Sequence, residues 1–404
     1  MPRYIAIPKN RPDAAALAET PGGYTPKARA ERIGLLHKFT SEDESLYLPK
    51  DLLKKFTEHK VIATPERNTP LTGVTIIEGG AEIVADLQNE LPDHDIIEDF
   101  DFNLVAPNPA EGPPPPQDNI DRWHLEAINL GKARSGGFSG IGEGIGVAVM
   151  DTGIAEVDEI AGRIKSAYEL DDDMNAIEIL TKDTDGHGTG VAALIAGRTI
   201  GVAPGVDLMN FITIPQRRGT YSNFLIAAEN IAQKPGISVV NISAGIIGWE
   251  PRIKPGIRAL LDTYILPVVA VGNEGSDTSR SPGNYTEVLS IGAANKRGRV
   301  WSGSGSATMV PDLMRYTIPD AVAPGERVTT CNGDGEFRIF SGSSLATPIV
   351  SGIAALIIEK YPNITDLELR EEIFEACEQL EGVTSARQGS GIVQIPTTLW
   401  FTGV

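Results

Sequence analysis

Residues 145–153 read IGVAVMDTG, an unbroken apolar run that ends at an aspartate and a glycine turn. A short apolar run of this kind predicts a strand that is buried on both faces of a sheet. Further strand signals recur downstream, and helix signals alternate with them. The strand signals lie at 206–214, 236–245 and 265–273, and the helix signals at 187–198, 223–234 and 345–360.

This alternation predicts an α/β fold, with a mostly parallel sheet and helices on both of its faces. In sheets of this kind, ligands bind beyond the carboxyl ends of the strands. Asp151, Ser243 and Asn273 each stand at such an end. We therefore expect the functional site at this edge of the sheet.

A proline-rich segment divides the chain. Residues 106–119 read APNPAEGPPPPQDN, and the four successive prolines favour an extended linker without regular pairing. We predict an N-terminal region over residues 1–105, a linker over 106–119 and a main body over 120–404.

The N-terminal region has the signals of a small α+β unit. Arg3–Ile7 alternates like a strand, and GVTIIEGG (residues 73–80) reads as a second strand. Residues 80–91 have the pattern of an amphipathic helix, and residues 95–105 read as a closing strand. A charged, helix-prone stretch occupies residues 27–60.

The composition suits a loop-rich globular protein. The chain has 404 residues, 43 glycines, 28 prolines and a formal net charge of −19. Such an acidic surface argues against nucleic acid or anionic membranes as partners. Two cysteines do not support a disulfide framework and fit a reducing compartment. With no signal-peptide pattern and no apolar run near ~20 residues, we expect a cytoplasmic protein, with leaderless export as the alternative.

Four polar residues that follow one another along the chain, each close to glycine, suggest hydrolytic chemistry. They are an acid, a base, an amide and a hydroxyl, namely Asp151, His187, Asn273 and Ser344. Peptide hydrolysis needs a nucleophile, a base, an acid that orients the base, and donors for the oxyanion. Each residue alone also has a structural explanation, in a turn, a helix start or a helix cap.

The serine is placed by a proline that follows it. Pro348 fits the first turn of a helix, where its missing N–H costs nothing. Ser344 then lies at the helix N-terminus, where free amides favour a developing anion. Ser341 and Ser343 compete with it on chemistry alone.

The four segments resemble those of the subtilisin-like (S8) serine peptidases. The patterns Asp-Thr-Gly, His-Gly-Thr, Gly-Asn-Glu-Gly and Gly-Ser-Ser-x-Ala-Thr-Pro coincide with the four residues in the family's order. The likeness covers roughly residues 120–400 and includes the segments 241–245, 323–325 and 389–393. Four independent motifs in the correct order make this resemblance specific.

The resemblance implies a serine endopeptidase that works through an acyl-enzyme. Ser344 would attack the peptide carbonyl, His187 would take its proton, and Asp151 would orient the imidazole. Asn273 and the backbone N–H of Ser344 would bind the oxyanion. This chemistry needs no cofactor.

The resemblance also implies that protein or peptide substrates bind in extended form by strand addition. Tyr221 and Phe224 would wall a distal apolar pocket. Glu274 would touch the primary pocket and tolerate a basic side chain there. The expected substrate-binding residues are Gly219, Thr220, Tyr221, Phe224, Ser243, Ala244, Gly245, Gly272 and Glu274.

Two features depart from the family pattern. Gly190 stands where the family usually has a second histidine, at a position that is not catalytic. The link IAGRTIGVAP (residues 195–204) is short, so the loop that holds the strong calcium site of calcium-dependent subtilisins looks missing. The acidic run Asp171–Asp173 offers a cation ligands, but we favour a solvated loop, and a structural calcium stays open.

The region before the linker resembles a subtilisin propeptide with an unusual insertion over residues 10–70. The resemblance implies a small ferredoxin-like prodomain whose tail lies in the active site and is cut near Leu104, Val105 and Ala106. The prodomain would act as chaperone, inhibitor and first substrate. The alternative is a permanent regulatory or adaptor domain.

We therefore interpret the chain as a subtilisin-like endopeptidase made as an autoprocessed zymogen. A catalytically silent binding protein with the same fold is the main alternative, although all four motifs are complete. A serine esterase of the α/β-hydrolase type calls for Gly-x-Ser-x-Gly with the serine first in the chain, whereas here the serine is last. An aspartic protease needs two Asp-Thr-Gly copies, and this chain has one.

Overall fold

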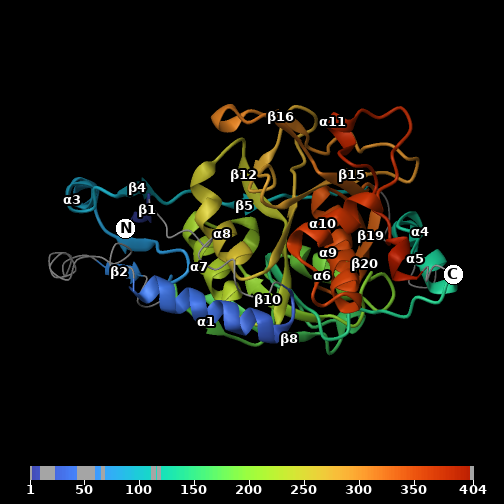
Figure 1. Ribbon diagram of the computed structural model, residues 1–404, viewed down its shortest axis with the longest axis horizontal. Helices are drawn as coiled ribbons and strands as arrows, with labels where there is room; N and C mark the ends of the chain where they lie inside the picture. Colours follow the sequence, from blue (N-terminus) through green and yellow to red (C-terminus); the bar gives the residue numbers. More distant parts are fainter. Residues whose placement is uncertain are drawn as a thin grey trace.

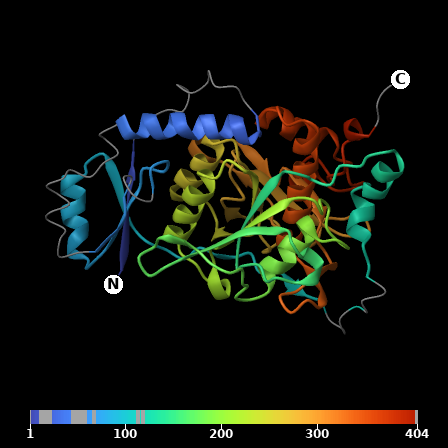
Figure 2. The ribbon, with the colours of Figure 1, turned by 90° about the horizontal axis from the view of Figure 1, so that it is seen from below.

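The computed structural model describes residues 2–9, 23–42, 60–64, 69–110, 115 and 120–400. They form a large body with a smaller sheet beside it, which comes from the N-terminal region (Figures 1 and 2). The predicted linker over 106–119 therefore lies partly outside the described residues.

The body is built on an eight-stranded sheet with the strand order β18-β15-β13-β11-β7-β10-β8-β9. All neighbouring strands are parallel except β8 and β9, which are antiparallel. The sheet is therefore mostly parallel, as the sequence predicts. Its strands are β7 (Gly146–Asp151), β8 (Ile164–Leu170), β9 (Ala176–Glu178), β10 (Asp207–Ile212), β11 (Ile237–Ile242), β13 (Leu266–Ala270), β15 (Leu289–Ala294) and β18 (Ala321–Pro324).

Helices cover both faces of this sheet, and the central strand β7 shows why its sequence is apolar throughout. Val147 and Val149 face α6 (His187–Ala196) and α9 (Ser343–Lys360) in one hydrophobic cluster. Ala148 and Met150 face α7 (Tyr221–Ala232) and α8 (Lys254–Asp262) in another. Successive side chains of a strand point to opposite faces, so both sets of positions must be apolar.

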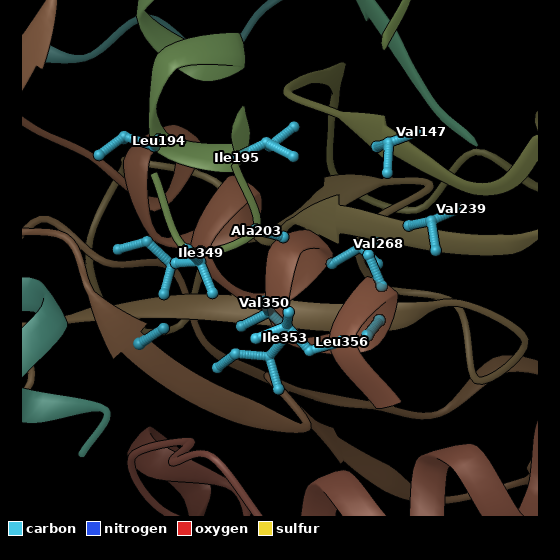
Figure 3. Close-up of a cluster of buried hydrophobic side chains, with 14 of the residues drawn as sticks. Val147, Leu194, Ile195, Ala203, Val239, Val268, Ile349, Val350, Ile353 and Leu356 are labelled. Atoms are coloured by element: carbon cyan, nitrogen blue, oxygen red, sulfur yellow. The ribbon is translucent and has the colours of Figure 1, made fainter. Parts of the chain in front are cut away.

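The long helix α9 runs through the first of these clusters. Ile349, Val350, Ile353 and Leu356 pack there against side chains of α6 and of the sheet (Figure 3). Among the described residues α9 is the one helix with the length and apolarity of a membrane span, and 89% of it is buried inside the body. A helix that is apolar all round is expected in the core of a large protein.

The N-terminal region contributes a four-stranded antiparallel sheet with the order β2-β3-β1-β4. One face packs on α3 through Ile83 and Leu87. The other face joins the cluster beneath α7 and α8 through Ile5 and Ile76. The elements are β1 (Arg3–Pro8), β2 (Lys60–Ala63), β3 (Thr75–Glu78), α3 (Glu82–Glu90) and β4 (His94–Glu98).

The helix-prone stretch at residues 27–60 starts with α1 (Pro26–Glu42), and residues 43–59 lie outside the described part. The helix runs along the outside of the body, as the blue helix in Figure 2 shows, and its Leu36 joins the same hydrophobic cluster as Ile5 of the small sheet.

The predicted single strand over residues 95–105 is wrong. β4 ends at Glu98, and the chain then turns toward the body. Asp99 causes the turn, because its carboxylate accepts hydrogen bonds from the backbone N–H and hydroxyl of Ser222 at the start of α7. The chain resumes as β5 (Asn103–Leu104) in a different sheet, paired with β12 (Ala244–Ile247).

The remaining elements are short and connect or flank the main layers. They are the strands β6 (Asn108–Pro109), β14 (Arg280–Ser281), β16 (Ala307–Met309), β17 (Tyr316–Ile318), β19 (Val328–Cys331) and β20 (Phe337–Ser341), the helices α4 (Trp123–Ala127), α5 (Leu130–Ser135), α10 (Asp366–Glu375) and α11 (Ser385–Gln388), and the 3₁₀ turns η4 (Asp158–Ile160), η5 (Pro215–Arg217), η6 (Pro251–Ile253), η7 (Pro311–Leu313) and η8 (Thr397–Leu399).

We expect Ile353→Ala to lower the free energy of unfolding by about 2–5 kcal/mol, because Ile353 is fully buried in the α9 cluster and its truncation leaves a cavity. Ile353→Val, which removes one methyl group, should cost about 0.5–1.5 kcal/mol. Urea unfolding of both variants beside the parent chain checks this. Equal losses for the two variants would contradict close packing at this position.

Candidate active site

Asp151 lies at the carboxyl end of the central strand β7 and is fully buried. Its Oδ1 accepts a hydrogen bond from the backbone N–H of Thr152 at 2.7 Å. The same oxygen lies 2.8 Å from His187 Nδ1. A buried carboxylate needs such partners, because an unpaired charge is costly away from water.

His187 is the first residue of α6, and the loop before it is shaped by Asp183. One carboxylate oxygen of Asp183 accepts from the hydroxyl of Thr152 and the N–H of Gly186, and the other accepts from Thr189. Gly186 has φ 105°. A Cβ there would lie 2.2 Å from the side-chain oxygen of Asn332, so both the backbone and the space require glycine.

The environment of His187 raises its pKa above the ordinary histidine value. Burial acts against the imidazolium, but the charge and hydrogen bond of Asp151 favour it, with help from Asp183 and Asp185. Because this pKa is raised by folding, the paired imidazolium stabilises the folded chain below the ordinary pKa of histidine. The contribution is lost as the pH rises through the folded value.

Ser344 is the second residue of α9 and is fully buried. The prediction that Pro348 lies in the first turn is wrong, because the helix begins at Ser343 and Pro348 is its sixth residue, although Ser344 still lies at the helix N-terminus. Among the described residues, neither its Oγ nor His187 Nε2 has a hydrogen-bond partner. A Cβ on Gly342 would lie 3.0 Å from Ser344 Oγ, 3.1 Å from Asn273 Nδ2 and 3.2 Å from Pro107 Cβ, so these groups converge on one point.

Asn273 follows β13 and faces the chain that crosses the site. Its Nδ2 donates to the carbonyl oxygen of Ala106 at 2.9 Å and lies 3.4 Å from that of Val105. Its Oδ1 accepts from the backbone N–H of Ser343 at 2.8 Å. The Ser343 hydroxyl also contacts Asn273 Oδ1 and the Gly272 carbonyl, which ties the start of α9 to the loop after β13.

The segment 101–105 lies between two edges of the body. Ala244 and Gly245 of β12 pair antiparallel with Leu104 and Asn103. The N–H of Val105 donates to the carbonyl of Ser243 at 2.8 Å. On the other edge, the N–H of Phe102 donates to the carbonyl of Gly219 at 2.9 Å, and Asp101 bridges to Thr220.

The aromatic residues expected at a distal pocket do lie beside this segment. Phe102 is buried against Phe224, with ring centroids 4.8 Å apart. Phe100 stacks on Tyr221 at the same centroid distance. Phe100 and Phe102 therefore pack on Tyr221 and Phe224, and the assignment of these two residues to a substrate pocket stays a prediction.

After Pro107 the chain continues along the opposite side of the site. Pro109 and Asn108 of β6 pair with Phe340 and Ser341 of β20. A cavity of about 130 Å³ opens beside this path, next to His187. Its lining residues are Pro107, Asp185, Gly186, His187, Gly190, Arg217, Thr330, Asn332, Phe340 and Leu345.

Glu274 differs from the expectation. Its Oε1 accepts from Arg280 Nε at 2.9 Å and from Arg280 Nη2 at 2.5 Å, and Arg280 also donates to the carbonyl of Gly245. The guanidinium of Arg280 thus neutralises the Glu274 carboxylate. Arg280 lies on β14, which pairs with β12. The ion pair with Arg280 therefore lowers the attraction of Glu274 for any other cation.

The acidic run at residues 171–173 forms a turn between β8 and β9. The carboxylate of Asp171 accepts hydrogen bonds from the backbone N–H groups of Asp173 and Asn175. Within the described residues there is no group of three or more histidine, cysteine or acidic side chains arranged to hold a metal ion.

Two residues that shape the site escape sequence reasoning. Asp183 begins the segment DTDGHGTG (residues 183–190), and its spacing from Thr189 is the one sequence signal for a carboxylate that organises this loop. Arg280 carries no such local signal, because its contacts with Glu274 and Gly245 arise from the pairing of β14 with β12.

Comparison with known proteins gives a consistent result. A family model described as "Subtilase family" matches residues 142–391. The chain is 31% identical over 372 residues to "Subtilisin-like protease PopC" of Myxococcus xanthus, covering 81% of this chain and 76% of that one. It is 32% identical over 227 residues to an "Intracellular serine protease" of Paenibacillus polymyxa, covering 54% and 67%.

Solved structures show the same likeness. The crystal structure of a cold-adapted subtilisin-like serine proteinase superposes with a TM-score of 0.54 and 25% sequence identity. The superposition covers 64% of this chain and 90% of that chain. Most of the architecture of that neighbour is therefore present in this chain.

We expect Asp151→Asn to move the titration of His187 to lower pH, because the substitution removes the charge that favours the imidazolium and leaves the burial that opposes it. Proton NMR of the histidine ring through a pH titration measures the shift. His37 on α1 provides an internal reference. An unchanged midpoint for His187 would show that Asp151 does not control its charge.

Proposed function

Since the chain belongs to the subtilase family and is therefore a serine-type peptidase, we propose that Asp151, His187 and Ser344 are its catalytic triad and that the whole chain is a zymogen. The observation that carries the proposal is the path of residues 101–110. They cross the site in extended form, with a peptide carbonyl beside Asn273 Nδ2.

In the proposed reaction, Ser344 Oγ bonds to the carbonyl carbon while its proton passes to His187 Nε2. The carbonyl oxygen becomes an anion, which the Asn273 amide and the Ser344 backbone N–H stabilise. His187 then gives the proton to the leaving nitrogen as the peptide C–N bond breaks. Water repeats the sequence and releases the acid, while Asp151 holds the imidazole throughout.

The backbone register supports Val105–Ala106 as the bond that is cut first. Val105 donates its N–H to Ser243 at the end of the strand pairing, so its carbonyl is the next group along the chain. The 3.4 Å separation between Asn273 Nδ2 and that carbonyl oxygen leaves a short movement before the oxyanion contact is made. Cleavage here would leave Ala106 as the new N-terminus and residues 1–105 as the propeptide.

The same contacts support a substrate class. Protein substrates would bind in extended form, since backbone groups of Gly219, Ser243 and Gly245 hold the segment independently of its sequence. Selection would come from a large apolar side chain at the position of Phe102, which Phe224 accommodates. The proton transfers and the stabilisation of charge are all assigned to side chains and backbone groups, so we propose that catalysis requires no cofactor.

We expect the purified parent chain to lose the mass of residues 1–105 and the Ser344→Ala chain to keep its full mass. The alanine side chain has no hydroxyl to attack the carbonyl, and loss of the nucleophile lowers kcat of a related protease by about 10⁶. Intact mass spectrometry and N-terminal sequencing of both proteins measure this. If both chains stay whole and neither cleaves unfolded casein, the site does not act as proposed, and a silent binding protein becomes the better interpretation.

We expect Arg280→Ala to favour peptides with lysine before the cleaved bond, because the substitution leaves the Glu274 carboxylate without its cation. The ratio of kcat/KM for lysine over alanine peptides should rise about tenfold, which corresponds to ~1.4 kcal/mol. The double variant Arg280→Ala with Glu274→Gln is the control and should lose this gain. A ratio that stays at the parent value would place the ion pair outside the primary pocket.

A further inference from the structure

The N-terminal region contacts the body at a second place, far from the site. Arg29 on α1 is fully buried, and its Nε donates to the carbonyl oxygen of Thr263 at 2.8 Å. Its Nη1 donates to the carbonyl oxygens of Lys234 at 2.6 Å and Pro235 at 2.9 Å. One guanidinium thus joins three backbone carbonyls of the body.

These carbonyls form a receptor suited to a guanidinium. Thr263 caps the end of α8, and Lys234 lies just beyond the end of α7. The last carbonyls of a helix lack intrahelical partners and carry partial negative charge. A planar fork of N–H donors can satisfy several of them at once, which the single ammonium of a lysine does less well.

Arg32 extends the contact by one helical turn. Its Nε donates to the carbonyl oxygen of Asp262 at 2.8 Å. Its guanidinium also stacks on the ring of Tyr264, with its carbon 4.8 Å from the ring centroid. Arg29 and Arg32 are three residues apart, so both lie on the face of α1 that meets the body.

The residues just before α1 are also anchored. Tyr24 is buried in the α9 cluster, its N–H donates to the carbonyl of Pro362, and its hydroxyl donates to Asp366 at 3.3 Å. The hydroxyl of Ser238 donates to the carbonyl of Tyr24. The anchor therefore reaches from the turns before β11 and β13 to the end of α9.

The contacts of α1 and the segment 101–105 lie at opposite ends of the parallel strands. Lys234 and Thr263 stand in the turns that lead into the amino ends of β11 and β13, whereas Ser243 and Asn273 follow the carboxyl ends of those strands. Cleavage at Val105–Ala106 breaks none of the α1 contacts. The N-terminal region then remains held at two separate places, which keeps the cut tail close to the site.

We infer that α1 is a second anchor of the propeptide, which binds through Arg29 and Arg32 to a guanidinium receptor of backbone carbonyls at residues 234–235 and 262–263. The anchor keeps residues 1–105 bound as an inhibitor after cleavage. This inference rests on the proposed function only for the cleavage at Val105–Ala106. Activation then depends on release of α1 as well as on hydrolysis.

The test uses the full chain carrying Ser344→Ala, with the recognition sequence of a site-specific protease in place of residues 111–116. That protease separates the N-terminal part from the body without using the chain's own site. We expect the two parts to stay together in size-exclusion chromatography. Arg29→Met should raise the dissociation constant about tenfold or more, and Arg32→Met should raise it less.

Lys27→Met is the matched control on the same helix. Lys27 is exposed and pairs only loosely with Glu31, at 4.0 Å, so its loss should leave the dissociation constant unchanged. The inference is wrong if the parent parts separate at once, or if both arginine variants behave like Lys27→Met. If Arg29→Met does not fold, Arg29→Lys, which keeps the charge but not the fork, takes its place beside Arg32→Met.

A second readout separates this inference from the proposed function. In the chain that keeps Ser344, Arg29→Met should shorten the delay between self-cleavage and activity on casein, while Lys27→Met should not. A chain that never cleaves itself contradicts the proposed function, and the experiment with the added protease still decides whether α1 is an anchor. Self-cleavage with identical delays in both variants contradicts the anchor alone.

Discussion

The buried carboxylate of Asp151 is the constraint on which the site depends. An ionised group at the end of a fully buried strand is costly unless charge and hydrogen bonds compensate it. His187 and the N–H of Thr152 supply that compensation. The imidazole can meet Asp151 only if the loop before α6 is held tightly, which Asp183 does through hydrogen bonds to Thr152, Gly186 and Thr189. The charge on one strand thus organises the whole segment that presents the imidazole of His187.

Among the parallel strands of the sheet, all carboxyl ends lie on one side of the body and all amino ends on the other. The N-terminal region contacts the body on both sides. At the carboxyl ends of the strands, backbone groups of β12 and Gly219 are open to pairing and hold residues 101–105 as an added strand. At the amino ends, the C-cap of α8 and the turn after α7 present backbone carbonyls that accept hydrogen bonds from Arg29. A segment bound only at the carboxyl ends can dissociate by losing its backbone pairing. A segment that is also bound at the amino ends must in addition break the hydrogen bonds of a buried guanidinium.

Electrostatic pairing within the body cancels a negative charge beside Asn273. Glu274 follows Asn273 directly, so a free carboxylate there would attract cations to this part of the body. Arg280 cancels that charge and also bonds to Gly245 of the edge strand. The same guanidinium therefore neutralises Glu274 and contacts the backbone of β12, which pairs with residues 103–104. Residues 101–105 themselves are held by backbone pairing and by the apolar contact of Phe102 with Phe224.

The sequence by itself determined the features that depend on local pattern. The apolar run at 145–151 predicts β7 almost to the residue, and glycines beside Asp151, His187, Asn273 and Ser344 mark where side chains emerge at strand or helix ends. Only the tertiary structure decided the split of the predicted strand at 95–105, the partner of Glu274 and the binding of Arg29. These depend on backbone carbonyls and strand pairings distant in sequence, and a carbonyl is the same for every residue, so no pattern of side chains reveals which arginine it will bind.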